Sequence, residues 1–158
     1  MEHVLHTLKP VFDKNSKILI LGSIPSPKSR ETGFYYGHPQ NRFWKILAGV
    51  FKCSVPLTTD EKLCFLLKTG ISLWDVIASC DIIGASDSSI KNVIPNDFNL
   101  IFDNCKINAV FTTGKTANKL YEKFTGKSAL LLPSPSPANC SVSLDTLIEK
   151  YKIILEYL

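Results

Sequence analysis

The feature that most constrains the fold is an unbroken run of aliphatic residues at positions 18–21, which ends in Gly22 and Ser23. A strand with one solvated face alternates apolar and polar residues, whereas a strand inside a parallel sheet is apolar throughout. Pro25 and Pro27 then stiffen the turn that follows. We therefore predict a rigid loop at the carboxyl end of a buried strand, the place where open α/β sheets bind ligands.

Strand and helix patterns alternate along the rest of the chain. Further apolar strands are predicted at residues 71–76, 107–112 and 129–132. A short leading helix and five amphipathic helices are predicted at residues 2–9, 44–51, 58–70, 96–105, 117–124 and 144–158. This order favours a three-layer α/β/α sandwich around a mainly parallel sheet of about four strands.

Two of these helices carry end signals. Thr58 and Glu61 have the spacing of a capping box, and Gly70 ends the same helix. Asn96 and Asp97 are placed to cap the helix that they precede. These signals fix helix boundaries and carry no functional meaning.

Each predicted strand ends in small or polar residues. The four pairs are Gly22-Ser23, Trp74-Asp75, Thr113-Gly114 and Pro133-Ser134. Because parallel strands place their carboxyl ends at one edge of a sheet, the four loops should crowd together there. That edge is the candidate active site.

The bulk composition fits one compact domain over residues 1–158, because 45% hydrophobic side chains suffice for a core at this length. The five cysteines are scattered without a Cys-x-x-Cys pair, so neither a disulfide framework nor a metal site is indicated. We expect no metal or organic cofactor. His3 and His6 fall in an N-terminal end that we expect to be exposed.

The N-terminus lacks a basic region followed by a long apolar run, and no segment approaches the roughly 20 apolar residues of a membrane span. We therefore expect a cytoplasmic monomer with no membrane association. The net charge of +4 permits a polyanionic partner without requiring one.

Three familiar motifs are disfavoured. Gly114-Lys115-Thr116 resembles the end of a phosphate-binding loop, but Ala109 occupies the position of its first glycine. The turn after the first strand lacks the later glycines of a dinucleotide site. Ser23, His38 and Asp75 supply the side chains of a hydrolase triad, yet Ser23 lies outside a G-x-S-x-G elbow.

Two other stretches suit a nucleic acid. Three consecutive aromatic residues, Phe34 to Tyr36, lie shortly before the amide of Asn41, a combination suited to a planar, hydrogen-bonding ligand such as a nucleobase. Residues 133–137, PSPSP, form either a rigid connector or a wedge that presses on DNA without losing much entropy.

Several blocks together resemble the uracil-DNA glycosylase superfamily, and within it the hypoxanthine (deoxyinosine) DNA glycosylase family. They are LGSIPS at 21–26, GFYYGHPQNRFW at 33–44, SLWDV at 72–76, DSSIKN at 87–92, PNDF at 95–98 and LPSPSPAN at 132–139. The HPQNRFW block is also shared with mismatch-specific uracil glycosylases. The resemblance implies an α/β/α domain that flips a damaged base and hydrolyses its N-glycosidic bond.

The resemblance also implies roles for individual residues. Mismatch-specific relatives carry an Asn in the first loop where this chain has Ile24, so catalysis is assigned to Asn41 of the His-Pro-x-Asn block. Many members have Asn where this chain has Thr113. The base-binding candidates are Gly22, Ser23, Ile24, Pro25, Tyr36, Trp74 and Asp75. The DNA-binding candidates are Ser26, His38, Lys115, Ser134, Pro135, Ser136, Pro137 and Asn139.

From these residues we expect Asn41 to hold a water, Tyr36 to stack on the base, and Asp75 either to accept a hydrogen bond from a ring N–H or to cap a turn. No lysine is placed to form a Schiff base, so we expect a monofunctional glycosylase. Its expected partner is double-stranded DNA with a deaminated base, most favourably hypoxanthine. The alternatives are a uracil or G:U/T mismatch glycosylase, and a nucleic-acid-binding protein without catalysis.

Overall fold

A parallel four-stranded sheet forms the centre of the computed structural model, which describes residues 1–158. Its strand order is β3-β2-β6-β7, and every neighbouring pair is parallel. The strands are β2 (Ile18–Gly22), β3 (Ile71–Asp75), β6 (Ala109–Thr113) and β7 (Leu130–Leu132). All four coincide, within two residues at each end, with predicted strands.

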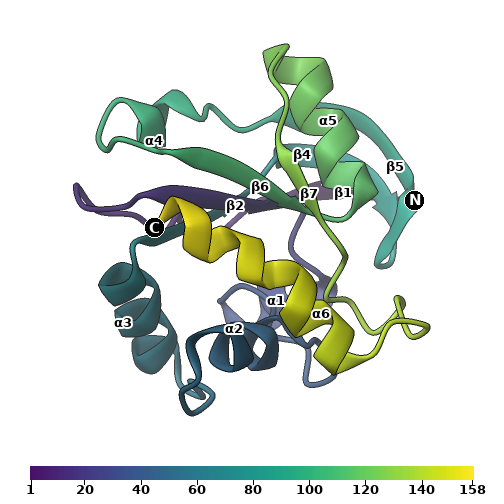
Figure 1. Ribbon diagram of the computed structural model, residues 1–158. Helices are drawn as coiled ribbons and strands as arrows, with labels where there is room; N and C mark the ends of the chain where they lie inside the picture. Colours follow the sequence, from purple (N-terminus) through teal and green to yellow (C-terminus); the bar gives the residue numbers. More distant parts are fainter.

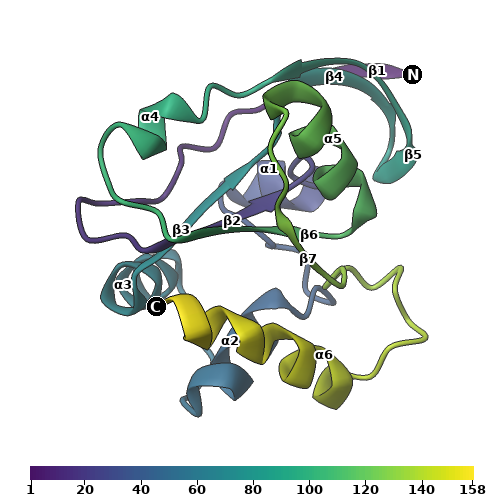
Figure 2. The same cartoon turned by 45° about the horizontal axis from the view of Figure 1, so that its top comes forward.

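Helices cover both faces of this sheet, as Figures 1 and 2 show. One layer contains α2 (Phe43–Phe51), α3 (Thr59–Thr69), α6 (Leu144–Tyr151) and the 3₁₀ helix η1 (Lys152–Tyr157). The other contains α4 (Asn99–Phe102) and α5 (Lys115–Thr125), and the short α1 (Pro27–Thr32) lies in the loop after β2. The predicted three-layer α/β/α arrangement is confirmed.

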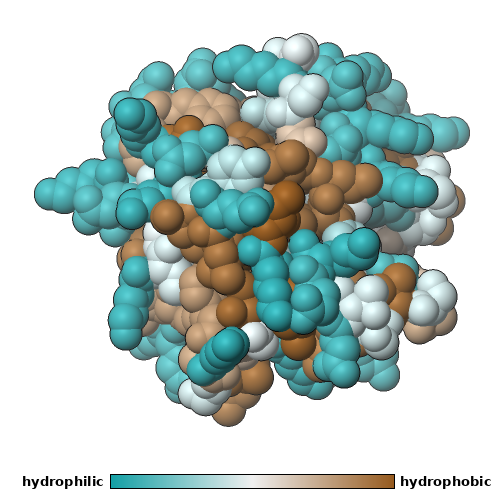
Figure 3. Space-filling model, in the orientation of Figure 1, coloured by the Kyte–Doolittle hydropathy of each residue, from teal (hydrophilic) through white to brown (hydrophobic).

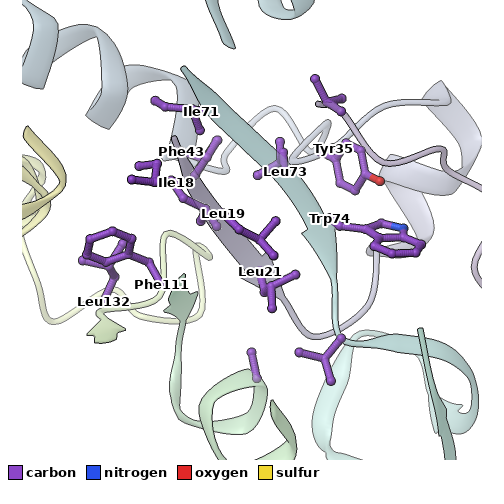
Figure 4. Close-up of a cluster of buried hydrophobic side chains, with 14 of the residues drawn as sticks. Ile18, Leu19, Leu21, Tyr35, Phe43, Ile71, Leu73, Trp74, Phe111 and Leu132 are labelled. Atoms are coloured by element: carbon purple, nitrogen blue, oxygen red, sulfur yellow. The ribbon is translucent and has the colours of Figure 1, made fainter. Parts of the chain in front are cut away.

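The core is centred on β2, whose side chains from Ile18 to Leu21 are fully buried. Figure 4 shows Ile18, Leu19 and Leu21 surrounded by side chains of the flanking strands and of the helix that begins at Phe43. Burying one such aliphatic side chain stabilises the fold by about 1.5–3 kcal/mol. The central strand therefore holds the loop after Gly22 on a rigid base.

A second sheet, which the sequence pattern did not reveal, lies beside α5. It is antiparallel, with the order β1-β4-β5, and comprises β1 (Glu2–Leu5), β4 (Ile77–Ile83) and β5 (Ser86–Pro95). Helix α5 contacts both β6 and β5, so it joins the two sheets. Strand β5 is mostly solvent-exposed, which is why its sequence lacks the apolar alternation of a half-buried strand.

Two predicted helices differ from the structure. Residues 2–9 do not form a helix: Glu2–Leu5 is a short edge strand, held by pairing with β4 and by the single buried side chain of Val4. The helix predicted at 96–105 has only one turn, although the carboxylate of Asp97 does accept the backbone N–H of Asn99 at 3.1 Å.

The helix at 58–70 agrees with its end signals. Thr58 Oγ1 accepts the backbone N–H of Glu61 at 3.1 Å, and Gly70 ends the helix with a left-handed φ of 80°. The Glu61 carboxylate accepts the N–H of Leu57 rather than that of Thr58, at 3.0 Å. The capping box is therefore formed with its return bond shifted by one residue.

Apolar side chains also reach the surface near the edge strand β7. Leu130 and Leu131 are exposed there, and Figure 3 shows apolar residues gathered across the middle of this face with hydrophilic residues around them. No helix in the structure combines the length and apolarity needed to cross a membrane.

Candidate active site

A cavity of about 860 Å³ opens at the carboxyl ends of the parallel strands. Residues at the carboxyl ends of all four strands line it, among them Gly22, Asp75, Thr113 and Ser134. The tip of the β4–β5 hairpin, residues 84–88, closes one side. This size falls within the range of small-molecule sites, so the predicted crowding of strand ends does produce a pocket.

Most of the predicted site residues line this cavity: Gly22, Ser23, Ile24, Pro25, Ser26, Tyr36, Asn41, Asp75, Lys115, Ser134, Pro135, Ser136 and Asn139. Three predicted residues, Trp74, His38 and Pro137, are not among its lining residues. His38 and Pro137 are half-buried in the surrounding loops.

Trp74 faces the core, not the cavity. Successive side chains of a strand point to opposite faces, so Asp75 and Trp74 cannot both reach the cavity. The indole packs edge-on against His6 and Phe98, with ring centroids 6.5 and 6.2 Å away, and it is buried in Figure 4. The prediction that Trp74 binds the base is corrected: its side chain stabilises the fold.

Asn41 lies directly before α2, where the chain turns into the helix. Its Oδ1 accepts the backbone N–H of Phe43 at 2.9 Å, and its own backbone N–H donates to the carbonyl of His38 at 2.9 Å. No protein group accepts a hydrogen bond from its amide nitrogen. The carboxamide is thus held in one orientation and keeps one lone pair and two N–H donors for a ligand.

Tyr36 is held from two sides. Its ring stacks on Phe43, with centroids 3.9 Å apart and planes inclined by 19°, and its hydroxyl forms a 3.1 Å hydrogen bond with Thr113 Oγ1. Burial and the nearby Asp75 carboxylate raise the pKa of the Tyr36 phenol, so it stays protonated. Its backbone has a positive φ of 52°, a strained conformation for an aromatic residue that the surrounding contacts must maintain.

Asp75 forms a buried pair with His6, which corrects the expectation that His6 is exposed. His6 Nε2 and Asp75 Oδ2 are 2.8 Å apart, and their side chains are 3% and 5% exposed. The other Asp75 oxygen lies so close to Gly22 that a Cβ there would be 2.5 Å from it. Only glycine therefore fits at position 22.

The loop after β2 presents free backbone donors to the cavity. The carbonyls of Gly22 and Ser23 accept the N–H groups of Val76 and Ile77 at 2.9 and 3.1 Å, which fixes the loop to the start of β4. The N–H groups of Ser23, Ile24 and Ser26 donate to no protein acceptor. Unpaired N–H groups at a cavity wall are suited to an anionic or oxygen-rich ligand.

Asp87, which our sequence analysis did not assign to the site, brings a second carboxylate to the cavity. It lies on β5, and Ser23 Oγ donates to its two oxygens at 3.1 Å each. Burial raises the pKa of the Asp87 carboxyl, the Ser23 hydrogen bond opposes that rise, and repulsion by Asp75 adds to it. The one sequence signal was its place in the DSSIKN block, whose position depends on a hairpin that we did not predict.

Arg42 was also missed, and it fixes the Pro-rich loop beside Asn41. Its guanidinium donates to the carbonyls of Val142, Asn139 and Ser136, the latter two at 2.8 and 3.3 Å. Its backbone N–H donates to the carbonyl of Pro135 at 3.1 Å. The loop at 133–142 is therefore anchored to the residue that follows the catalytic candidate.

Three basic side chains, Arg30, Lys115 and Lys150, also line the cavity. They place positive charge beside the cavity, which suits an anionic ligand. The structure contains no group of three His, Cys, Asp or Glu side chains arranged to hold a metal ion.

Comparisons with known proteins agree with this geometry. The family model of the uracil DNA glycosylase superfamily matches residues 9–157. A hypoxanthine DNA glycosylase of Methanosarcina barkeri is 34% identical over 135 residues, which cover 82% of this chain and 85% of the relative. One from Methanosarcina acetivorans is 34% identical over 134 residues, which cover 82% and 84%.

The fold agrees as well. A solution NMR structure from Methanosarcina acetivorans, provisionally assigned as a uracil DNA glycosylase, superposes with a TM-score of 0.78 at 29% identity and covers 95% of this chain and 98% of that one. The strand-end cavity, the matching family model and the relatives along most of the chain lead to one conclusion: the chain belongs to the uracil DNA glycosylase superfamily, whose members hydrolyse N-glycosidic bonds.

Proposed function

We propose that this DNA glycosylase excises a deaminated base, with hypoxanthine as its main substrate, by hydrolysis of the N-glycosidic bond. The observation that carries the proposal is the cavity that joins the oriented amide of Asn41, the ring of Tyr36 and the free N–H groups of the loop after β2. The relatives named hypoxanthine DNA glycosylases support hypoxanthine as the substrate.

A base inside a duplex cannot enter such a cavity, so the nucleotide must leave the helix. Unstacking costs a few kcal/mol. Stacking on an aromatic side chain recovers about 1–3 kcal/mol of that cost. Because Phe43 already covers one face of Tyr36, the base stacks on the remaining face. The fixed ring needs no reordering when the base arrives.

The bond-breaking step requires a positioned water and a stabilised leaving base. Asn41 Oδ1 has a lone pair left beside its bond to Phe43, and it accepts a hydrogen from the water so that the water oxygen faces the sugar carbon C1′. As the bond breaks, negative charge develops on the base. The N–H groups of Ser23, Ile24 and Ser26 donate to that charge from a fixed backbone.

The remaining contacts hold the DNA strand. The loop residues Ser134, Pro135, Ser136, Pro137 and Asn139 press on the backbone around the flipped nucleotide, with the loop kept rigid by Arg42. Lys115, exposed at the start of α5, pairs with a phosphate, and His38 contacts the strand from the outer loop. The enzyme is a monofunctional glycosylase that leaves an intact abasic strand.

Uracil is the second candidate substrate. The matching family model and the similar solved structure both carry the name of uracil DNA glycosylases. Uracil, like hypoxanthine, presents a carbonyl beside a ring N–H, so the same donors and acceptors of the cavity can bind either base.

The test is an excision assay on labelled duplexes that contain a single deoxyinosine, a single deoxyuridine or a G:T mismatch. We expect abasic sites in the deoxyinosine duplex, at a rate above those of the other two. Faster excision of uracil or thymine would overturn the hypoxanthine assignment. Duplex binding without any abasic site would indicate a nucleic-acid-binding protein. A borohydride-trapped protein–DNA adduct would contradict the monofunctional mechanism.

A further inference from the structure

We propose that Asp87, held by Ser23, determines substrate specificity by accepting a hydrogen bond from the ring N–H that deamination creates on the target base. The inference deepens the proposed function and rests on it. It assigns the base-reading carboxylate to the β4–β5 hairpin, not to the buried Asp75 at the end of β3.

The geometry places the Asp87 carboxylate, which still has free lone pairs, in the cavity wall. The Asp87 carboxylate has about four lone-pair sites. One hydroxyl proton, that of Ser23, serves both oxygens at 3.1 Å. No lysine, arginine or histidine lies within salt-bridge distance of Asp87. The ion pairs of the chain all involve other carboxylates. Asp87 therefore retains capacity for a donor that a ligand must supply.

Asp75 is less suited to this task. One of its oxygens is engaged by His6 at 2.8 Å, and the other lies against the backbone of Gly22. Its backbone carbonyl further accepts the side-chain amide of Asn96 at 2.9 Å, so the whole residue is locked in place. Asp75 supports the floor of the cavity, whereas Asp87 stands on the exposed hairpin beside the entrance.

The chemistry of deamination matches a carboxylate acceptor. Adenine carries a bare ring nitrogen at N1, which only accepts hydrogen bonds, and deamination to hypoxanthine turns it into an N1–H donor. Cytosine and uracil differ in the same way at N3. A carboxylate that faces this position attracts the deaminated base and repels the lone pair of its parent. Guanine and thymine carry the same donor, so other parts of the site must reject them.

The size of the effect follows from the hydrogen bond to a charged group, which contributes about 1.5–3 kcal/mol. Each 1.4 kcal/mol corresponds to a tenfold change, so Asp87 should favour a base with the ring N–H by about 10- to 100-fold. Asp87→Asn keeps the shape of the side chain and a partner for the Ser23 hydroxyl but removes the negative charge, so the ring N–H loses its charged acceptor.

The test compares two duplexes, one with deoxyinosine and one with purine deoxyriboside, which keeps the purine frame but lacks both the N1–H and the 6-oxo group of hypoxanthine. For wild type we expect faster single-turnover excision of hypoxanthine. For Asp87→Asn we expect hypoxanthine excision to fall by about 10- to 100-fold, with purine excision within about threefold of wild type. An equal loss on both duplexes, or no loss, overturns the inference.

A matched control is Asp81→Asn, which removes the same charge from the same hairpin at a position outside the cavity, where Asp81 contacts His3 and Asn92. We expect this variant to keep the wild-type ratio between the two duplexes. Thermal unfolding at pH 7 checks that both variants are folded. A folded Asp87→Asn variant that keeps the wild-type ratio between the two duplexes would contradict the inference.

The two proposals fail in different ways. If wild type leaves no abasic site in either duplex, the proposed function is wrong. The binding of the free bases then tests Asp87 alone, by calorimetry with hypoxanthine and with purine. We expect wild type to bind hypoxanthine about tenfold more tightly than purine and Asp87→Asn to lose this preference. Equal affinities in wild type, or no binding of either base, would overturn the assignment of Asp87.

Discussion

The Arg42 contacts give a prediction that can be worked out from the structure. Arg42 has a planar fork of five N–H donors, and here it reaches three carbonyls of the loop at 133–142. The substitution Arg42→Lys keeps the positive charge but offers one compact ammonium group, which cannot reach carbonyls that lie in different directions. The loop should then open more often while the rest of the fold stays intact.

The magnitude follows from the two shorter bonds, those to Val142 and Asn139, because the bond to Ser136 at 3.3 Å is near the limit of useful length. A hydrogen bond from a charged donor contributes about 1.5–3 kcal/mol, and the low end applies because the freed carbonyls regain water. The loss is about 3 kcal/mol of local stability. Amide hydrogen exchange in the loop should therefore accelerate by about 100-fold.

The assay is amide hydrogen exchange followed by mass spectrometry, read at the loop amides of Asn139 and Val142, whose N–H groups bond within the loop. The matched control is Lys45→Ala, which removes an exposed positive charge from α2 without touching the loop. Excision of the damaged base by Arg42→Lys should need more protein for half-saturation. Wild-type exchange in the loop of Arg42→Lys would refute this reasoning, as would equal acceleration in Lys45→Ala.

Two further predictions concern residues that surround the base. Tyr36→Phe removes the hydroxyl that bonds Thr113, so Tm should fall by a few degrees while the ring still stacks on the base. Tyr36→Leu removes the ring and should slow excision by about 10- to 100-fold. Equal excision rates in the two variants would contradict stacking. Gly22→Ala places a Cβ 2.5 Å from Asp75 Oδ1, and the hydrogen bond to His6 keeps the Asp75 carboxylate from moving away. Both Tm and the excision rate should therefore fall. Wild-type values of both would contradict the close packing.

The parallel sheet could be predicted from the sequence because a strand buried on both faces is apolar throughout. The aliphatic run at 18–21 is apolar on both faces, and the structure buries it completely. The strand-end loops follow from the parallel arrangement, and Gly22, Asp75 and Thr113 do meet at one cavity. Local pattern and long-range packing agree in this part of the chain.

The antiparallel sheet could not be predicted in this way, because its strands depend on each other more than on a buried face. Residues 2–5 bury only Val4, and β5 is mostly exposed, so neither shows a periodic pattern. Because the antiparallel sheet was not predicted, neither the place of Asp87 in the cavity wall nor the burial of His6 could be predicted. Strand pairings between residues far apart in the sequence bring Asp87 to the cavity and His6 to Asp75.

The Arg42 contacts were hidden for a related reason. An arginine at the start of an amphipathic helix ordinarily faces solvent, and only the path of the chain at 133–142 brings three carbonyls to Arg42. Trp74 was misplaced because it belongs to the same motif as Asp75, while adjacent residues of a strand face opposite sides. Motif membership therefore led to the strand end that lines the cavity without giving the direction of each side chain.

The central claim is that the amide of Asn41 positions the attacking water. Asn41→Ala removes the oxygen that accepts the N–H of Phe43, a single hydrogen bond that contributes about 0.5–1.5 kcal/mol of stability, so the fold should survive. Single-turnover excision of hypoxanthine from a deoxyinosine duplex, with a melting curve of the same sample, gives the direct test. Our account predicts a folded protein whose rate is lower by about 100- to 1000-fold or more. A folded Asn41→Ala variant that excises hypoxanthine at the wild-type rate would contradict it.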